Sequence, residues 1–244
     1  MTEFNQYLEK QTCILCGEEL HKLDKIEDRV CDFCGQMKSV PVLCDNSHCI
    51  CSDCLSMTAE EFVIDRCLKY KGINPIELAV EIMNSPVVRM HGAEHHFIVP
   101  AVLTACLHNY HKSTGDLKEK LYSLHRRAIA ETPRACSYDI GTCGAALGTG
   151  VFISSYLNHN LVEEDEWSLA NKIIAIALKK VADAGPPRCC KRDTYLSLQA
   201  TIEFMKDQFA IELPLYEAKC TFSLRNRTCK HEECQFYNLS NSLV

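Results

Sequence analysis

The sequence predicts a mainly α protein, in which an all-helical C-terminal domain follows a small cysteine-rich N-terminal module. Three observations predict this fold class. Eight of the 17 cysteines lie between Cys13 and Cys54, where large apolar residues are few. After residue 55 the apolar residues recur at helical spacing, and no segment there alternates as a strand does. We therefore expect two domains, residues 1–55 and 56–244.

The composition narrows the partners and the compartment. The net charge of -6 argues against nucleic acid or an anionic membrane as a partner. No apolar run reaches the length of a membrane span, and the polar start MTEFNQYLEKQT lacks the regions of a signal peptide. We therefore expect a cytoplasmic location, where reducing conditions disfavour disulfides and favour metal binding or thiol chemistry as the role of the cysteines.

The N-terminal module has the spacing of zinc knuckles. In a C-x-x-C-G turn two thiolates reach one tetrahedral ion, and the glycine lets the backbone curl beneath it. A module this small cannot fold on apolar burial alone, so we expect two structural zinc ions and a surface open to a protein partner. Nine residues compete for eight ligand positions, with His48 and Cys49 as rivals for one of them: Cys13, Cys16, Cys31, Cys34, Cys44, His48, Cys49, Cys51 and Cys54. The spacing allows sequential ribbons or a RING-like cross-brace.

The helices of the C-terminal domain follow from capping residues and apolar periodicity. Asn74 and Pro75 mark the start of one helix, and Gly185 marks the end of another. The expected helices cover residues 56–70, 74–85, 97–112, 114–131, 136–157, 163–184 and 193–209.

The helix expected over residues 136–157 is unusually rich in glycine, which costs up to about 1 kcal/mol per residue in an exposed helix. One interpretation is a central helix with very closely packed neighbours. The other is that bare backbone approaches a ligand held by Cys136 and Cys143, which stand seven apart on one helix face. The two interpretations are compatible.

The stretch AGPPRCCKRD places Cys189 and Cys190 among Arg188, Lys191 and Arg192 at the start of the last helix. Positive charge and a helix N-terminus lower thiol pKa values, so we expect a soft-metal site here, with the basic residues available to bind substrate. A reactive thiol pair without metal and a strained vicinal disulfide are the alternatives.

Two further segments carry metal-binding residue types. His91, Glu94 and His95 form H-x-x-E-H, the spacing of inverted zinc peptidases, in which Glu94 acts as general base and the acidic run 163–166 offers a third ligand. The alternatives are that these residues handle substrate and protons, or that they cap and pack. The tail holds Cys220, Cys229, His231 and Cys234, for a third structural zinc, donation into a neighbouring cluster, or free thiols.

Three segments in order resemble the helical catalytic domain of the iron-sulfur L-serine dehydratases and L-cysteine desulfidases: HGAEHHFIVPAVL (91–103), CSYDIGTCGAALGTG (136–150) and GPPRCCKRDTYLSLQATI (185–202). The knuckles followed by this body also resemble a family of anaerobe proteins without an assigned function. In the dehydratases a [4Fe-4S] cluster leaves one iron free to bind a substrate, which then loses water or hydrogen sulfide.

The resemblance implies a set of cluster ligands. Cys136 matches the first cluster cysteine, and Cys189 or Cys190 matches the one before the final helix. The family has a further cysteine where this chain has Leu178 and Lys179. The resemblance therefore leaves the third thiolate to Cys143, to the second of the adjacent pair, or to Cys229 or Cys234 in the tail.

These observations together predict an iron-sulfur lyase acting on a small molecule, by a dehydratase or desulfidase type of elimination. The residues expected to handle substrate and protons are His91, Glu94 and His95. A non-catalytic metal-binding or sulfur-carrier protein that serves another enzyme is the alternative, beside the zinc peptidase. A homo-oligomer is compatible with either.

Overall fold

The computed structural model describes residues 19–32, 35–53, 57–85, 87–131, 141–157 and 164–238. The chain is mostly helical, as expected. It divides into two compact units, one of Met1–Phe62 with Ser85–Val87 and the other of Val63–Asn84 with Val88–Val244. The expected division after residue 55 falls inside the first unit, and the domain boundary stays a prediction.

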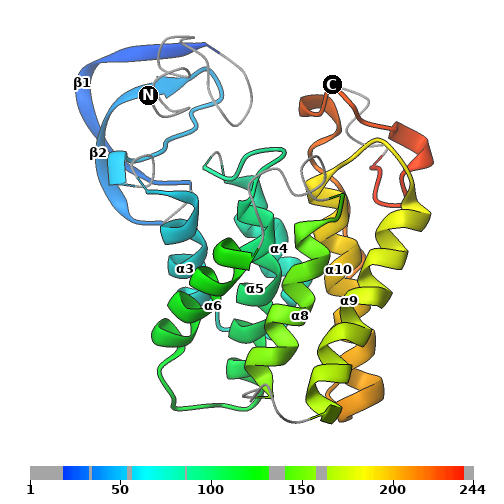
Figure 1. Cartoon of the computed structure of the whole chain (residues 1–244). Coiled ribbons are helices and arrows are strands. Elements are labelled where there is room, and N and C mark those ends of the chain that lie inside the picture. Colours follow the sequence, from blue (N-terminus) through cyan, green and yellow to red (C-terminus); the bar gives the residue numbers. More distant parts are fainter. Residues whose placement is uncertain are drawn as a thin grey trace. The chain divides into compact units, whose positions relative to one another are not determined.

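The first unit contains an antiparallel hairpin of β1 (Leu20–Val30) and β2 (Met37–Cys44), blue in Figure 1. Leu20 pairs with Cys44 and Val30 with Met37, and the register shifts between Lys22 and Glu27. In the connecting turn Gly35 has a φ of 65°, and its N–H donates to the Cys31 carbonyl at 2.9 Å. The glycine of this knuckle therefore takes the left-handed conformation, which suits the tight turn expected there.

The capping residues that the sequence offers are used. α3 (Ala59–Lys69) begins at a capping box, in which the Glu61 N–H donates to Thr58 Oγ1 at 3.2 Å and the Thr58 N–H donates to Glu61 Oε2 at 2.9 Å. α4 (Pro75–Asn84) follows Asn74, whose Oδ1 accepts from the N–H groups of Ile76 and Glu77. Both starts confirm the sequence prediction.

The second unit is built around three buried helices. α5 (Glu94–Tyr110) packs against α6 (Leu117–Glu131) and against α8 (Gly144–Tyr156), and α8 also packs against α9 (Glu164–Ala184). α10 (Cys190–Phe209) packs against α9, α8 and α5 (Figure 1). Apolar side chains of α5, α8 and α10 form most of the core.

The glycines of α8 let its neighbours come close. A Cβ on Gly148 would lie 2.6 Å from the backbone oxygen of His96 in α5, and a Cβ on Gly150 would meet the side chain of Ile174 in α9. The interpretation of a closely packed central helix is therefore confirmed. It does not exclude the second interpretation, since a Cβ on Gly144 would meet the His96 ring.

Several helix starts differ from the predicted residues by about one turn, among them those of α3, α5 and α6. Two of the differences affect candidate site residues. α10 begins at Cys190 rather than near Asp193, because Lys191, Arg192 and Asp193 are buried within its first turn instead of forming a polar connection. α8 begins at Gly144, so Cys143 is its N-cap residue in extended conformation and does not stand on a helix face with Cys136. Cys136 lies outside the described residues. None of the helices that the structure describes is long and apolar enough to cross a membrane.

Candidate functional site

A cavity of about 350 Å³ lies in the second unit, where three distant segments meet. The start of α5 contributes His95 and His96, the turn before α8 contributes Thr142 and Cys143, and the connection from α9 to α10 with the first turn of α10 contributes the remaining polar residues. Those residues are Arg188, Cys190, Arg192 and Asp193, and the rest of the lining is mainly glycine and apolar. The volume is at the lower end of the range of small-molecule sites, roughly 300 to 1,000 Å³.

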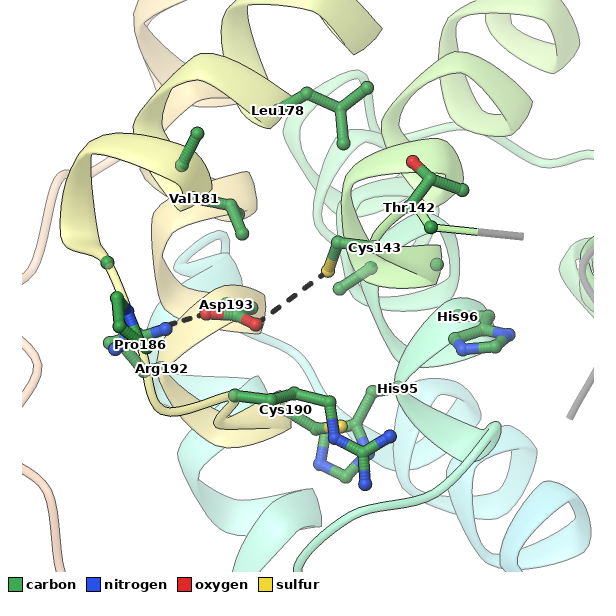
Figure 2. A pocket seen from close by; sticks show the side chains of 16 residues that line it. His95, His96, Thr142, Cys143, Leu178, Val181, Pro186, Cys190, Arg192 and Asp193 are labelled. Atoms are coloured by element: carbon green, nitrogen blue, oxygen red, sulfur yellow. Dashed lines mark hydrogen bonds and ion pairs between the residues drawn. The ribbon is translucent and has the colours of Figure 1, made fainter. Parts of the chain in front are cut away.

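Cys143, Asp193 and Arg192 form a connected row along this cavity. Cys143 Sγ donates to Asp193 Oδ2 at 3.9 Å, and Arg192 Nε donates to Asp193 Oδ1 at 3.0 Å (Figure 2). Burial, with the Asp193 carboxyl adding to it, raises the pKa of the Cys143 thiol to about 12. Burial also raises the pKa of Asp193, against the opposing effect of Arg192. Cys143 is therefore a protonated thiol near neutral pH, and a metal that binds there must displace its proton.

His95 lines the cavity, and one of its ring nitrogens makes no hydrogen bond to the described residues. Its Nδ1 lies 3.1 Å from the Gly92 carbonyl oxygen, which only accepts, so Nδ1 carries the proton in the neutral ring. Its Nε2 is buried and makes no hydrogen bond within the described part of the chain. Burial lowers the pKa of His95 well below its ordinary value, and the nearby Lys191 charge contributes. The ring is therefore neutral at physiological pH, with Nε2 able to accept a proton or a metal ion.

Arg188 and Arg192 line the same cavity, as the sequence analysis expected of a substrate site. Arg192 is 6% exposed, and its Nη1 has no hydrogen-bond partner among the residues that the structure describes. A buried guanidinium nitrogen without an acceptor favours an anionic ligand, and a carboxylate matches its fork geometry.

Lys191 has a different role from the one expected. It is 1% exposed, and its Nζ donates to the backbone carbonyls of Met83 at 3.0 Å and Val88 at 3.3 Å. It does not line the cavity. Burial, with the Arg225 charge adding to it, lowers the pKa of Lys191 to about 7. The assignment of Lys191 to substrate binding is therefore wrong, because its ammonium ties α10 to the end of α4.

Cys189 and Cys190 line different cavities, although they are adjacent in the chain. Cys190 lines the first cavity, whereas Cys189 lines a second one of about 30 Å³ together with Cys220, Cys229 and Cys234. The prediction that the basic residues lower the Cys189 pKa is wrong, because burial raises it to about 11 and outweighs the hydrogen bond and charge of Arg192. Cys220 was not among the expected cluster ligands. The only feature of the sequence that pointed to metal binding by Cys220 was its position in a cysteine-rich tail.

The H-x-x-E-H motif does not place its histidines on one helix face. α5 begins at Glu94, so His91 precedes the helix, and Gly92 stands in the connection. Glu94 accepts from Arg89 Nε at 2.6 Å and from Nη2 at 3.1 Å instead of pointing to a shared ligand. Burial lowers the pKa of His91, with help from the Arg188 charge. Of the acidic run that offered a third ligand, Glu163 and the side chain of Glu164 lie outside the described residues. Glu166 is described in α9 and is not among the residues that line the cavity.

The first unit brings its described candidate ligands together in two groups. Cys44 Sγ lies 3.5 Å from His48 Nδ1. Cys31 packs against Cys51, whose N–H donates to Cys31 Sγ at 3.4 Å. Cys49 instead packs against Val40 and Leu43, and burial raises its pKa to about 11. The remaining expected ligands lie outside the described residues: Cys13, Cys16, Cys34 and Cys54.

No three Cys, His, Asp or Glu side chains in the described ranges already stand around one metal position. In the comparisons with known proteins, a family model described as "Family of unknown function (DUF5714)" matches residues 63–237. No curated protein and no solved structure matches the chain. The matched residues include every residue of the two cavities.

Proposed function

The chain belongs to the DUF5714 family of unknown function, and from that premise we propose that its first cavity is the active site of an iron-sulfur-dependent lyase. The substrate is a small carboxylate with a hydroxyl or thiol on the β carbon. The reaction breaks the Cα–H bond and the Cβ–O or Cβ–S bond. It forms a C=C bond between these carbons and releases water or hydrogen sulfide. It therefore needs no oxidant or reductant.

The observation that carries the proposal is the meeting of Cys143 and Cys190 with His95 and two arginines in one cavity. Two thiols suit a soft metal. Cys136 is the proposed third thiolate, by its resemblance to the dehydratase motif. Among the alternatives for that position, Cys189, Cys229 and Cys234 are disfavoured because they line the second cavity.

A cluster held there would act as a Lewis acid on the substrate hydroxyl or thiol. Arg188 and Arg192 would bind the substrate carboxylate, since both line the cavity and Arg192 Nη1 lacks an acceptor within the described residues. His95 Nε2 would accept the Cα proton, because its Nδ1–H is already committed to Gly92. Asp193 would hold Arg192 in position. His91 and Glu94 are left with supporting roles.

We also propose that the first unit binds two structural zinc ions. Cys31 and Cys51 fall in one group and flank Cys44 and His48, which form the other, so a knuckle shares its group with one that is not its neighbour in the chain. This is the arrangement of a cross-brace rather than of sequential ribbons. A reducing, cytoplasmic compartment suits both proposals.

The decisive measurement is the iron and acid-labile sulfide content of protein purified without oxygen. We expect both, and we expect Cys143→Ser and Cys190→Ser to lose most of the iron, because each removes a cavity thiol. A panel of β-hydroxy and β-thiol amino acids then identifies the substrate through release of water or sulfide. Arg192→Lys should raise KM more than it lowers kcat, because Lys offers no fork to a carboxylate.

Cys67→Ala is the control, since Cys67 is a buried cysteine of α3 that lines neither cavity. Protein that contains zinc but neither iron nor sulfide would contradict the lyase proposal. That result would favour the metal-binding or sulfur-carrier alternative.

A further inference from the structure

The second cavity gathers four cysteines from segments that lie far apart in the chain. Cys189 is the N-cap residue of α10, whereas Cys220, Cys229 and Cys234 belong to the tail that follows that helix. The tail returns to the end of the bundle where α9 stops and α10 starts, in red and yellow in Figure 1. Lys230 Nζ donates to the Ala184 carbonyl at 2.9 Å, and the Cys220 N–H donates to the Phe236 carbonyl at 2.7 Å. The four sulfur-bearing residues are therefore held by backbone contacts around one small space.

Two of these cysteines already receive backbone hydrogen bonds at sulfur. The Phe222 N–H donates to Cys220 Sγ at 3.3 Å, and the His231 N–H donates to Cys229 Sγ at 3.4 Å. Asn226 Nδ2 lies 3.7 Å from Cys189 Sγ and donates to it. N–H groups directed at sulfur favour the thiolate over the thiol, and they are the outer-shell bonds that orient metal-bound cysteines.

The cavity also contains buried polar groups that lack partners. The hydroxyls of Tyr195 and Ser223 line it, and neither makes a hydrogen bond within the described residues. Tyr195 is 0% exposed and Ser223 is 4% exposed. Buried hydroxyls are rarely left unpaired, so both point to a missing acceptor. A thiolate sulfur is an acceptor, whereas a protonated thiol accepts only weakly.

The charge around the cavity suits a thiolate centre. A zinc ion with four thiolates carries a net charge of -2, which is costly to bury without compensation. Arg192 and Lys230 both line the cavity, so two cationic side chains lie beside it, although Arg192 also lines the first cavity and pairs with Asp193. Size favours a single ion over a cluster, because about 30 Å³ exceeds the roughly 10–15 Å³ that one water molecule needs but is far smaller than the 350 Å³ of the first cavity.

We propose that Cys189, Cys220, Cys229 and Cys234 form a structural zinc site that fastens the C-terminal tail to the start of α10. The four sulfurs do not yet stand around one point in the described residues, so binding includes rotation of the cysteine side chains about χ1. A fully thiolate-ligated ion has no open coordination position, and the site is therefore structural rather than catalytic. The proposal does not depend on the iron-sulfur site, whose cysteines line the other cavity, although Arg192 lines both.

The test is the zinc content of the full chain, measured beside its iron content. We expect Cys189→Ser, Cys220→Ser, Cys229→Ser and Cys234→Ser each to lose one zinc per chain and to keep the iron of the wild type. Cys190→Ser is the matched control, because it is the chain neighbour of Cys189 and should keep all of the zinc. Retention of full zinc by the tail variants, or loss of zinc from Cys190→Ser alone, would overturn the proposal.

A second measurement uses the wild-type protein, so it tests the proposal even if the variants fail to fold. Alkylation of the wild-type protein with iodoacetamide, followed by mass spectrometry, should find all four cysteines protected until a chelator is added. Replacement of zinc by cobalt should give the intense sulfur-to-cobalt absorption of a tetrahedral thiolate site, and Cys229→Ser should weaken it. Alkylation of all four without chelator would sink the proposal, as would iron rather than zinc lost from Cys229→Ser.

Discussion

His48 and Cys49 are neighbours in the chain, yet the structure gives them different surroundings. His48 Nδ1 stands 3.5 Å from Cys44 Sγ, at the distance of two side chains that can share an ion. Cys49 packs against Val40 and Leu43 and is 2% exposed. Its N–H donates to Asp32 Oδ2 at 2.6 Å, which a side-chain substitution would leave in place. Cys49 also lies close enough to Cys31 and Cys51 for their charges to raise its pKa. We propose that His48 rather than Cys49 takes the contested ligand position, because His48 lies beside another candidate ligand whereas Cys49 packs in an apolar cluster.

This assignment predicts opposite outcomes for two adjacent substitutions. His48→Ala should lower the zinc content by one ion per chain, because it removes a ligand. Cys49→Ala should keep all of the zinc, with a modest loss of stability from a smaller buried side chain. Zinc analysis by mass spectrometry of the native protein compares them directly. The reverse pattern would show that Cys49 is the ligand.

At the scale of elements, glycine in α8 allows this helix to pack very closely against α5. The space at Gly148 is closed by backbone, since a Cβ there would meet the His96 carbonyl oxygen at 2.6 Å. Backbone within a packed helix cannot move aside as the end of a flexible side chain can. The same carbonyl belongs to the first turn of α5, which carries His95 and His96 to the cavity.

We therefore predict that Gly148→Ala lowers the free energy of unfolding by about 1–3 kcal/mol, as overpacking does in other cores. Urea denaturation followed by circular dichroism measures it. Gly115→Ala is the matched control, because a Cβ at Gly115 would meet nothing within 4 Å, and it should leave the midpoint unchanged. A Gly148→Ala variant as stable as the control would mean that the two helices separate without cost.

The sequence was sufficient for the elements whose ends carry local signals. Thr58 with Glu61, Asn74 with Pro75, and Gly185 are all recognisable from residue type, because capping is satisfied within a few residues. The start of α10 was misplaced since Cys190, Lys191 and Arg192 look like an exposed polar turn. Their burial depends on Met83, Val88 and Asp193, and only the tertiary fold brings Met83 and Val88 to Lys191.

The residue types of the candidate site could be predicted from the sequence. Which of those residues line the first cavity and which line the second could not. The sequence indicates that Cys143, Cys190 and Arg192 belong to metal or substrate chemistry. It does not indicate that Cys189 faces Cys220 instead of Cys143, because successive residues at a helix start point in directions about 100° apart. The tail determines which neighbour each side chain contacts, and no local sequence signal predicts the path of the tail after α10.

The two units of the molecule differ in the size of the apolar core that stabilises each of them. The second unit has a large apolar core contributed by α5, α8 and α10. In the first unit the described core is two small clusters, Cys31 with Cys51 and Val40 with Leu43 and Cys49. Clusters of this size do not outweigh the conformational entropy of the chain, and the proposed zinc ions would supply the difference.

A strong chelator should therefore act on the two units unequally. We expect protease cuts to appear before residue 63 and in the tail after residue 219, while the segments of α5, α8 and α10 stay intact. The helical circular dichroism signal should fall little, because these helices do not depend on metal. Limited proteolysis with mass spectrometry locates the cuts. Early cleavage inside α5 or α10 would contradict this division.

The separation of Cys189 from Cys190 has a consequence for how the chain acquires its metals. One peptide bond joins a residue of a 30 Å³ cavity to a residue of a 350 Å³ cavity. In the proposed assignment, volume rather than affinity sorts the cofactors, since a lone ion fits the smaller space and only the larger one admits a cluster. Zinc loaded first at Cys189 would fix the first turn of α10 and orient Cys190 before iron arrives. Two consecutive residues would then determine the order in which the metals bind.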